Sequence, residues 1–197
     1  MAPLTYLTSA ELQGLGLRSC GRDVRISRDA RIYGASAVSI GDHVRIDDFT
    51  VISGREAVRI GRNVHIAQFC GLYGGAGLEL EDFSGLSSRV AIYTQSDDYS
   101  GEAMTNPTVP TRFRAVKAGP VRVGRHAIIG SGAVVMPGVS LGDGSAVGAL
   151  SLVTRDVKAW TIVAGVPARL LKTRSQTLLA FESEYLEMGD EDVVSTA

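Results

Sequence analysis

Few side chains in this sequence could accept a proton near neutral pH. There are three histidines, His43, His65 and His126, and two adjacent carboxylates, Asp97 and Asp98, which open a polar segment. A carboxylate with an ordinary pKa of about 4 is a weak base for a hydroxyl group. It serves an amine more easily, because an amine needs its proton removed only after it has attacked. We expect structural roles for His43 and His126.

The polar segment supplies the candidates for acid–base chemistry. We predict that Asp97 accepts or orients the proton of an acceptor group, with Asp98 or His65 assisting. The alternative for Asp98 is a turn former directly before Tyr99, and the alternative for His65 is a polar surface or interface residue. Tyr99 and Asn106, in the same segment, are predicted to bind the acceptor.

The scaffold that must position these groups is a repeat with a period of six. Aliphatic side chains recur in triplets that return after about 20 residues, and only one of the 18 positions, Cys20, is not aliphatic. The positions are Cys20, Ile26, Ile32, Ile40, Ile46, Ile52, Ile60, Ile66, Leu72, Leu80, Leu86, Ile92, Val123, Ile129, Val135, Leu141, Val147 and Val153. Helical periodicity is absent from this stretch, so an amphipathic helical protein is excluded.

A second series, four residues after each aliphatic position, holds small or β-branched side chains, with Glu56 as the exception. Each six-residue step therefore resembles a short strand followed by a corner. Three steps close a triangular coil, and successive coils stack in parallel so that their backbone groups pair. We predict an all-β fold, a parallel β-helix. Cys70 belongs to the second series, so we expect a buried thiol rather than a nucleophile.

The chain divides into three segments. Residues 1–19 form an N-terminal cap, in which Thr8-Ser9-Ala10-Glu11 has the form of a capping box that opens a short helix. Residues 20–172 form the β-helix, interrupted by an inserted loop at 94–122; long insertions on rigid scaffolds usually carry function. Residues 173–197 contain a short helix that covers the other end, and a tail whose last eight or so residues look frayed.

One stretch of the sequence carries a family signature. It reads VRVGRHAIIGSGAVVMPGVSLGDGSAVGALSLVTRDV, followed by IVAGVPARLLK. On these motifs, residues 20–172 resemble the hexapeptide-repeat acyltransferases, which include maltose, galactoside and nucleotide-sugar acetyltransferases. The resemblance implies a left-handed coil and a homotrimer with active sites in the clefts between subunits. It also implies acetyl-CoA as co-substrate, lying along the last coils.

The acceptor site departs from that of the maltose and galactoside enzymes. In the sugar acetyltransferases of this family a histidine deprotonates the acceptor hydroxyl, and its position falls on Asp97. An Asn and an Asp of the maltose and galactoside enzymes fall on Ala67 and Gly75. The resemblance therefore implies an acetyltransferase acting on an amine or hydroxyl of a sugar, with a nucleotide-linked sugar destined for a polysaccharide as one candidate, and the carboxylate favours an amino sugar.

Small and basic residues are the candidates for binding CoA. Small residues let the pantetheine arm approach the strands, with one amide free to polarise the thioester carbonyl; basic residues near the end of the coil suit the CoA phosphates. These candidates are Gly130, Ser131, Ala133, Gly148, Ala149, Arg155, Arg169 and Lys172. The alternatives are coil corners for the small residues and solvated surface charges for the basic ones.

Composition excludes several other classes of protein. A net charge of −1 argues against nucleic acid as the main partner. No apolar run approaches the roughly 20 residues that a membrane-spanning helix needs, and no signal peptide is recognisable, so we expect a cytoplasmic protein without membrane insertion. Two cysteines are too few for a disulfide framework and fit no metal-ligand spacing.

Two alternative functions remain for such a coil. A zinc-dependent carbonic anhydrase of the same fold needs three histidine ligands, two of them close in sequence, and the histidines here are widely spaced. We therefore expect no metal. A structural β-helix subunit would need neither the long insertion nor the Gly165-Val166-Pro167-Ala168-Arg169 ending.

Overall fold

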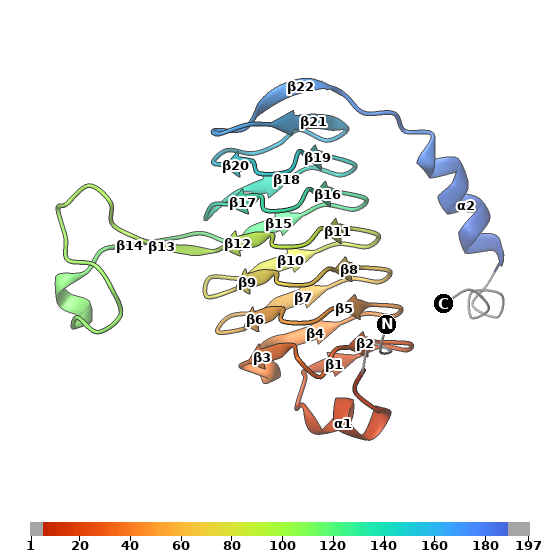
Figure 1. Ribbon diagram of the computed structural model, residues 1–197, viewed down its shortest axis with the longest axis horizontal. Coiled ribbons are helices and arrows are strands. Elements are labelled where there is room, and N and C mark those ends of the chain that lie inside the picture. Colours follow the sequence, from red (N-terminus) through yellow and green to blue (C-terminus); the bar gives the residue numbers. More distant parts are fainter. Residues whose placement is uncertain (1–5, 189–197) are drawn as a thin grey trace.

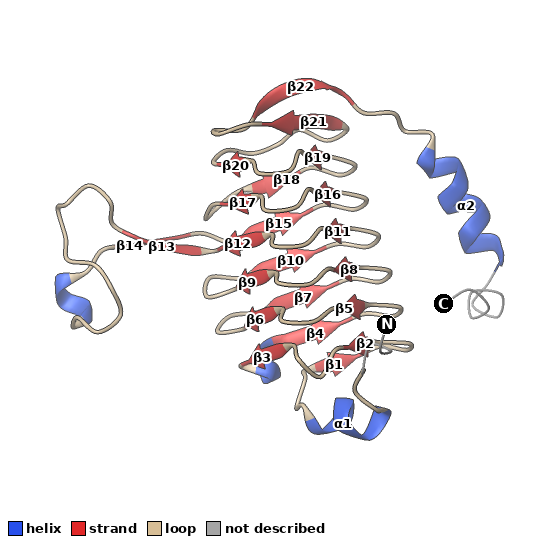
Figure 2. Cartoon of the chain, viewed as in Figure 1, coloured by secondary structure: helices blue, strands red, loops and turns tan. Residues whose placement is uncertain are grey.

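The computed structural model, which describes residues 6–188, is a tall prism of stacked coils (Figure 1). Each regular coil gives one short strand to each of three sheets, which we call sheets I, II and III. Strands and tight turns make up the coils, and the longer helices lie outside them (Figure 2). No helix of the described residues is long and apolar enough to cross a bilayer.

The sheets run the length of the prism. Sheet I contains, in spatial order, β1 (Ser19–Cys20), β4 (Val38–Ile40), β7 (Val58–Ile60), β10 (Leu78–Leu80), β15 (Val121–Val123) and β18 (Ser140–Leu141). Sheet II contains β2 (Arg25–Ile26), β5 (Arg45–Ile46), β8 (His65–Ile66), β11 (Gly85–Leu86), β16 (Ile128–Ile129), β19 (Ala146–Val147), β21 (Thr161–Ala164) and β22 (Arg169–Thr173). Sheet III contains β3 (Arg31–Tyr33), β6 (Val51–Ser53), β9 (Gly71–Tyr73), β12 (Ala91–Tyr93), β17 (Val134–Val135) and β20 (Leu152–Val153).

The aliphatic repeat stacks as the sequence predicts. Ile60 pairs with Ile40 of the coil before it and with Leu80 of the coil after it, and all three side chains are buried. Burying one such side chain stabilises the fold by about 1.5–3 kcal/mol, so a column of them accounts for the rigidity of the prism. The predicted left-handed parallel β-helix is confirmed.

The second series lies in the corners, where space is short. Thr50 and Cys70 are buried at one corner of consecutive coils. The Cys70 thiol donates a hydrogen bond to the carbonyl of Ser87 at 3.2 Å, and burial raises the pKa of this thiol to about 11. A thiol that is buried and protonated at neutral pH is a poor nucleophile, as the sequence predicts for Cys70.

The insertion forms a hairpin arm that extends away from the prism on the left in Figure 1. Its two strands, β13 (Gln95–Asp97) and β14 (Val116–Ala118), pair antiparallel directly after β12. The arm also contains the 3₁₀ turn η2 (Thr111–Phe113). Strand β15 then resumes sheet I against β10, so the insertion leaves the stacking of the coils intact.

The N-terminal end is capped by α1 (Ser9–Gly14), and a 3₁₀ turn, η1 (Ala35–Ala37), follows β3. The predicted capping box is confirmed, because the Thr8 side chain accepts from the amide of Glu11 while the Glu11 carboxylate accepts from the amide of Thr8. The expectation that Cys20 fills the interior is wrong. Its strand, β1, is the edge strand of sheet I, so among the described residues no strand pairs with it on the outer side, and Cys20 stays exposed.

The C-terminal end is closed differently from the expectation. Strand β22 folds back antiparallel on β21 and covers the last coil. Helix α2 (Leu178–Met188) therefore does not cover that end; it runs beside the edge between sheets I and II (Figure 1). There the Tyr185 hydroxyl accepts a hydrogen bond from the Asn63 side chain at 2.8 Å. The tail predicted to fray lies, from residue 189 on, outside the described residues.

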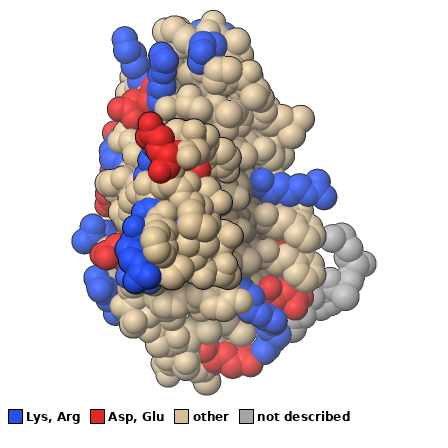
Figure 3. Space-filling view, turned by 90° about the vertical axis from the view of Figure 1, so that its left-hand side faces the viewer, with Lys and Arg blue, Asp and Glu red and all other residues tan. Residues whose placement is uncertain are grey.

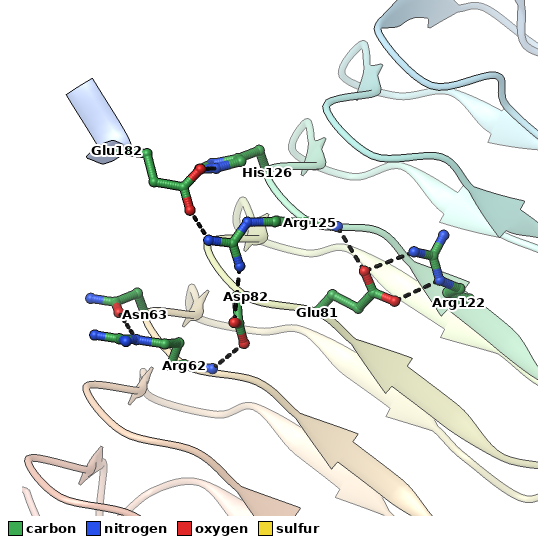
Figure 4. Close-up of polar contacts among 8 residues, drawn as sticks. All are labelled: Arg62, Asn63, Glu81, Asp82, Arg122, Arg125, His126 and Glu182. Atoms are coloured by element: carbon green, nitrogen blue, oxygen red, sulfur yellow. Dashed lines mark hydrogen bonds and ion pairs between the residues drawn. The ribbon is translucent and has the colours of Figure 1, made fainter. Parts of the chain in front are cut away.

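A polar cluster attaches α2 to the prism (Figure 4). The Glu182 carboxylate pairs with Arg125 and lies 2.8 Å from Nε2 of His126, whose ring stacks on Phe83. Burial, with the nearby Arg125 and Arg174 charges, lowers the pKa of His126 below its usual value. These contacts give His126 the structural role that the sequence predicts.

Candidate active site

A hollow of about 330 Å³ opens on the outer face of sheet II. It exists because the outward position of β11 is Gly85, which pairs with His65 on β8 and with Ile128 on β16. A Cβ atom added to Gly85 would meet no atom within 4 Å. A gap one side chain wide therefore separates His65 from Ile128.

Short polar side chains line the side of the hollow that meets the corner between sheets II and III, which we call the II–III corner. Gln68, Ser87, Ser88 and Ser131 come from the corners of three consecutive coils. Each follows a strand of sheet II by one or two residues, so the stacking of the coils places them in a vertical row. The hollow thus joins an imidazole, hydroxyl groups and an amide.

His65 is held by a buried carboxylate. Its Nε2 lies 2.9 Å from Oδ2 of Asp47, whose side chain is only 7 % exposed, whereas the His65 side chain is 50 % exposed. Arg45 donates to both carboxylate oxygens of Asp47, at 2.7 and 3.2 Å. Burial raises the pKa of Asp47, but the hydrogen bonds from Arg45 and His65 outweigh it, and the pKa lies below the usual value.

Two free amides lie at the II–III corner on consecutive coils. Ser131 and Ala149 are both exposed, and the amide of neither donates to an acceptor within the described residues. Ser131 also lines the hollow beside His65. An amide that projects free from a rigid corner can polarise a carbonyl oxygen, as expected for the thioester.

The other predicted small residues have tight structural surroundings. A Cβ on Gly130 would lie 2.5 Å from the nitrogen of Ala149, and one on Gly148 would lie 2.7 Å from Cβ of Ala164. Ala133 is buried, and its amide donates to the carbonyl of Gly130 at 3.2 Å. These contacts favour the coil-corner alternative for the three residues, and the part they play in binding CoA stays a prediction.

The predicted basic residues gather at the last coil. Arg155 and Arg169 line a second hollow of about 260 Å³, and Lys172 lies on β22, opposite Ile162. None of the three forms an ion pair with a described carboxylate. They are therefore available to an anion such as a phosphate, which stays a prediction.

On the arm, Asp98 is enclosed by its own loop. Its carboxylate accepts hydrogen bonds from the Ser100 hydroxyl and from the amides of Gly101, Glu102 and Ala103. The Ser100 hydroxyl and these amides hold the pKa of Asp98 below its usual range. The contacts favour the turn-forming alternative, and a part for Asp98 in catalysis stays a prediction.

Asp97 lies on β13 with its carboxylate partly exposed. Its Oδ2 accepts from the amide of Asn106 at 3.2 Å, so the arm brings these two predicted residues together. Tyr99 points into solvent with 91 % of its surface exposed. The structure does not join Asp97 to His65 within one chain, because β8 lies on the opposite side of the prism from the arm (Figure 1).

Sequence reasoning missed Asp47 and Ser87. Asp47 lies two residues after the outward position of β5, and Ser87 lies two after that of β11. The repeat itself carried this signal, since the position two after an outward residue lies at the start of the II–III corner in each coil. Among residues 6–188, no group of three His, Cys, Asp or Glu side chains is arranged to hold a metal ion.

Known proteins resemble this chain over almost its whole length. The family model for the bacterial transferase hexapeptide repeat matches residues 120–155. The chain is 41 % identical over 183 residues to the dTDP-4-amino-4,6-dideoxy-D-glucose acyltransferase of Escherichia coli, covering 92 % of this chain and 95 % of that protein. The likeness therefore includes the arm as well as the coils.

Solved structures show the same likeness. AntD, an N-acyltransferase from Bacillus cereus solved with dTDP and coenzyme A, has 41 % identity and a TM-score of 0.92, covering 94 % of this chain and 100 % of AntD. AntD has also been solved with dTDP and 3-hydroxybutyryl-CoA, at a TM-score of 0.89, 40 % identity and coverage of 93 % and 97 %. The chain belongs to the family of hexapeptide-repeat acyltransferases.

Proposed function

We propose that the protein transfers an acyl group from a CoA thioester to the amino group of a dTDP-linked 4-amino-4,6-dideoxy sugar. The observation that carries this proposal is the full-length likeness to AntD, which has been solved with dTDP-4-amino-4,6-dideoxyglucose and coenzyme A. An amine acceptor also agrees with an acidic residue, Asp97, where the sugar O-acetyltransferases have a histidine.

The reaction joins the hollow to the free amides of the II–III corner. The acceptor amine attacks the thioester carbonyl, a C–N bond forms, and the C–S bond breaks as CoA leaves. The amide of Ser131 or Ala149 stabilises the negative charge that develops on the carbonyl oxygen. Arg155, Arg169 and Lys172 hold the CoA phosphates at the last coil.

A serine and an aspartate at a fixed spacing support the choice of catalytic residues. AntD has been solved as variants at one serine and at one aspartate ten residues further along its chain. At the start of the arm, this chain offers two pairs at that spacing, Ser87 with Asp97 and Ser88 with Asp98. Because Asp98 is occupied by the amides of the arm, we assign Ser87 to the hollow and Asp97 to orienting the acceptor amine.

The two halves of this site lie on opposite sides of one chain, so we propose a homotrimer in which they meet between chains. Stacked aromatic rings lie exposed on either side of sheet III, Phe49 on Phe69 at 5.1 Å and Tyr73 on Tyr93 at 4.9 Å. Much of the surface on the arm side carries no charged side chain (Figure 3). Packing these surfaces together would let the arm of one chain bring Asp97 to the hollow of its neighbour.

Turnover with a matched pair of acceptors tests the function. The protein is incubated with acetyl-CoA and either dTDP-4-amino-4,6-dideoxyglucose or the same nucleotide sugar with a hydroxyl at carbon 4, and thiol release is followed. We expect release with the amino sugar and little with the hydroxy sugar. Equal release with both, or none with either, would contradict the proposal.

The length of the acyl group is tested with the same acceptor. Acetyl-CoA and 3-hydroxybutyryl-CoA are compared at equal concentration by kcat/KM. We expect acetyl to be preferred by this chain. A preference for 3-hydroxybutyryl-CoA would leave the proposed transfer to an amine unchanged but identify the longer acyl-CoA as the donor.

A further inference from the structure

The pair of His65 and Asp47 has a geometry that the proposed reaction can use. A neutral imidazole carries one hydrogen, on either Nδ1 or Nε2. Nε2 of His65 faces the Asp47 carboxylate at 2.9 Å, so it must carry the hydrogen and donate. Nδ1 is then left as an acceptor, and it has no partner among the described residues.

We propose that Asp47 is a positioning residue that fixes His65 with Nδ1 as the proton acceptor of the hollow. The proposal rests on the proposed function, because the proton it moves comes from the acceptor amine. Asp47 is suited to this part because it is buried and its orientation is fixed by two hydrogen bonds from Arg45. A histidine oriented by a buried carboxylate is a recurrent arrangement for general bases.

Two charged residues, Asp47 and Arg45, lie next to His65. On the same face, the strands above it carry Gly85 and Ile128, which have no charge. The remaining residues that line the hollow are also uncharged.

The proton follows a closed path. Attack by the amine forms the C–N bond and leaves the nitrogen with a positive charge; the C–S bond breaks, and its electron pair leaves with sulfur. The ammonium proton passes to Nδ1 of His65, and the imidazolium then gives it to the CoA thiolate. The products are the amide and the free thiol of CoA, and His65 returns to its neutral form.

In a purely structural reading, Arg45, Asp47 and His65 form a row of surface contacts that only stabilises sheet II. That reading predicts a loss of stability in the variant Asp47→Asn with no change in the protonation of His65. The chain offers a matched control, since His43 also faces a carboxylate, Asp23, at 3.3 Å, at a different corner. Asp23→Asn removes a charge from a His–Asp pair outside the hollow.

Nuclear magnetic resonance of the full-length protein with ¹⁵N-labelled histidine shows directly which ring nitrogen carries the hydrogen. The His65 signals are identified by their loss in His65→Gln. We expect the wild-type ring to carry its hydrogen on Nε2, and Asp47→Asn to give a mixture of both neutral forms, whereas Asp23→Asn leaves His65 unchanged. A wild-type ring with hydrogen on Nδ1, or an unchanged ring in Asp47→Asn, would overturn the proposal.

Steady-state kinetics gives the second readout. We expect kcat to fall about tenfold in Asp47→Asn while KM for the acceptor stays unchanged, and neither value to change in Asp23→Asn. The acceptor amine is the same for every variant, so a difference between variants reports the protein. If the wild-type protein acylates no amino sugar, the proposed function fails; a wild-type kcat in Asp47→Asn overturns the part of Asp47 alone.

Discussion

Asp97 and Asp98 are neighbouring carboxylates of the arm, but they make different contacts with the backbone. Asp98 accepts hydrogen bonds from the amides of its own loop, so moving its carboxylate away would leave these amides without their partner. Asp97 has one amide contact, from Asn106, and keeps the rest of its carboxylate free. Both residues are aspartates, so it is the hydrogen bonds of the loop that distinguish the two carboxylates.

Replacing Asp97 by Asn should lower kcat about 100-fold, because the amine loses the charged partner that orients it for attack. The affinity for CoA and the melting temperature should stay as in the wild type, since Asp97 contacts neither the core nor the last coil. Steady-state kinetics with the amino sugar and calorimetric titration of CoA measure both effects. Unchanged kcat would remove Asp97 from the mechanism.

Cys70 should resist alkylation in the folded protein. Burial protects its sulfur and raises the pKa of the thiol to about 11, whereas Cys20 is exposed. Iodoacetamide followed by peptide mass spectrometry should find Cys20 modified first, and Cys70 only after unfolding in urea. Rapid modification of Cys70 in the native protein, with parallel loss of activity, would contradict this account.

At the scale of the elements, two glycines of sheet II and its corner serve opposite purposes. Gly85 on β11 has open space where a side chain would be, and this space is the hollow. Gly130 follows β16 and lies against the backbone of the next coil, so its lack of a side chain is needed for stacking. The space beside Gly85 forms the hollow, whereas the missing side chain of Gly130 allows the coils to stack.

Gly85→Val should therefore fold normally and lose activity. Valine suits a strand, and its side chain would fill the gap between His65 and Ile128, so kcat/KM should fall at least tenfold at an unchanged melting temperature. The comparison variant is Gly130→Ala, whose added methyl meets backbone atoms and should destabilise the protein by about 1–3 kcal/mol in urea. Full activity in Gly85→Val would exclude the hollow as the acceptor site.

Helix α2 should depend on one carboxylate for its attachment. Glu182 joins Arg125 and His126 in a nearly buried position, and removing one partner of such a pair leaves the others unsatisfied (Figure 4). Glu182→Ala should lower the free energy of unfolding by about 2 kcal/mol. Glu184→Ala, on an exposed position of the same helix, is the control and should change little. Equal effects would mean that the cluster contributes nothing specific.

The elements also show what the sequence could predict. The six-residue period gave the sheets, their stacking and the arm, because each aliphatic position needs the one below it. The cover of the last coil by β22 was not predictable, since no repeat position marks a chain reversal at Gly165. The pairing of His65 with Asp47 was hidden for another reason: residues 18 apart become neighbours only when a coil of about 20 residues closes.

At the scale of the whole molecule, a single chain holds the two halves of the proposed site on opposite sides. The hollow and the free amides lie on sheet II and the II–III corner, whereas the arm carries Asp97 away from them (Figure 1). A prism is stiff, so no bending of the coils can join the halves. In the homotrimer that we propose, the arm of one chain would reach the hollow of its neighbour.

Complementation between two inactive variants tests this central claim. Asp97→Asn keeps the hollow intact, and Ser87→Ala keeps the arm intact; the two chains, with different tags, are co-expressed and the mixed assemblies are purified. If each site takes its arm and its hollow from different chains, one of the three sites in every mixed trimer carries both intact residues, and the purified mixed trimers should recover about a third of the wild-type activity. Mixed assemblies no more active than either variant alone would contradict the account.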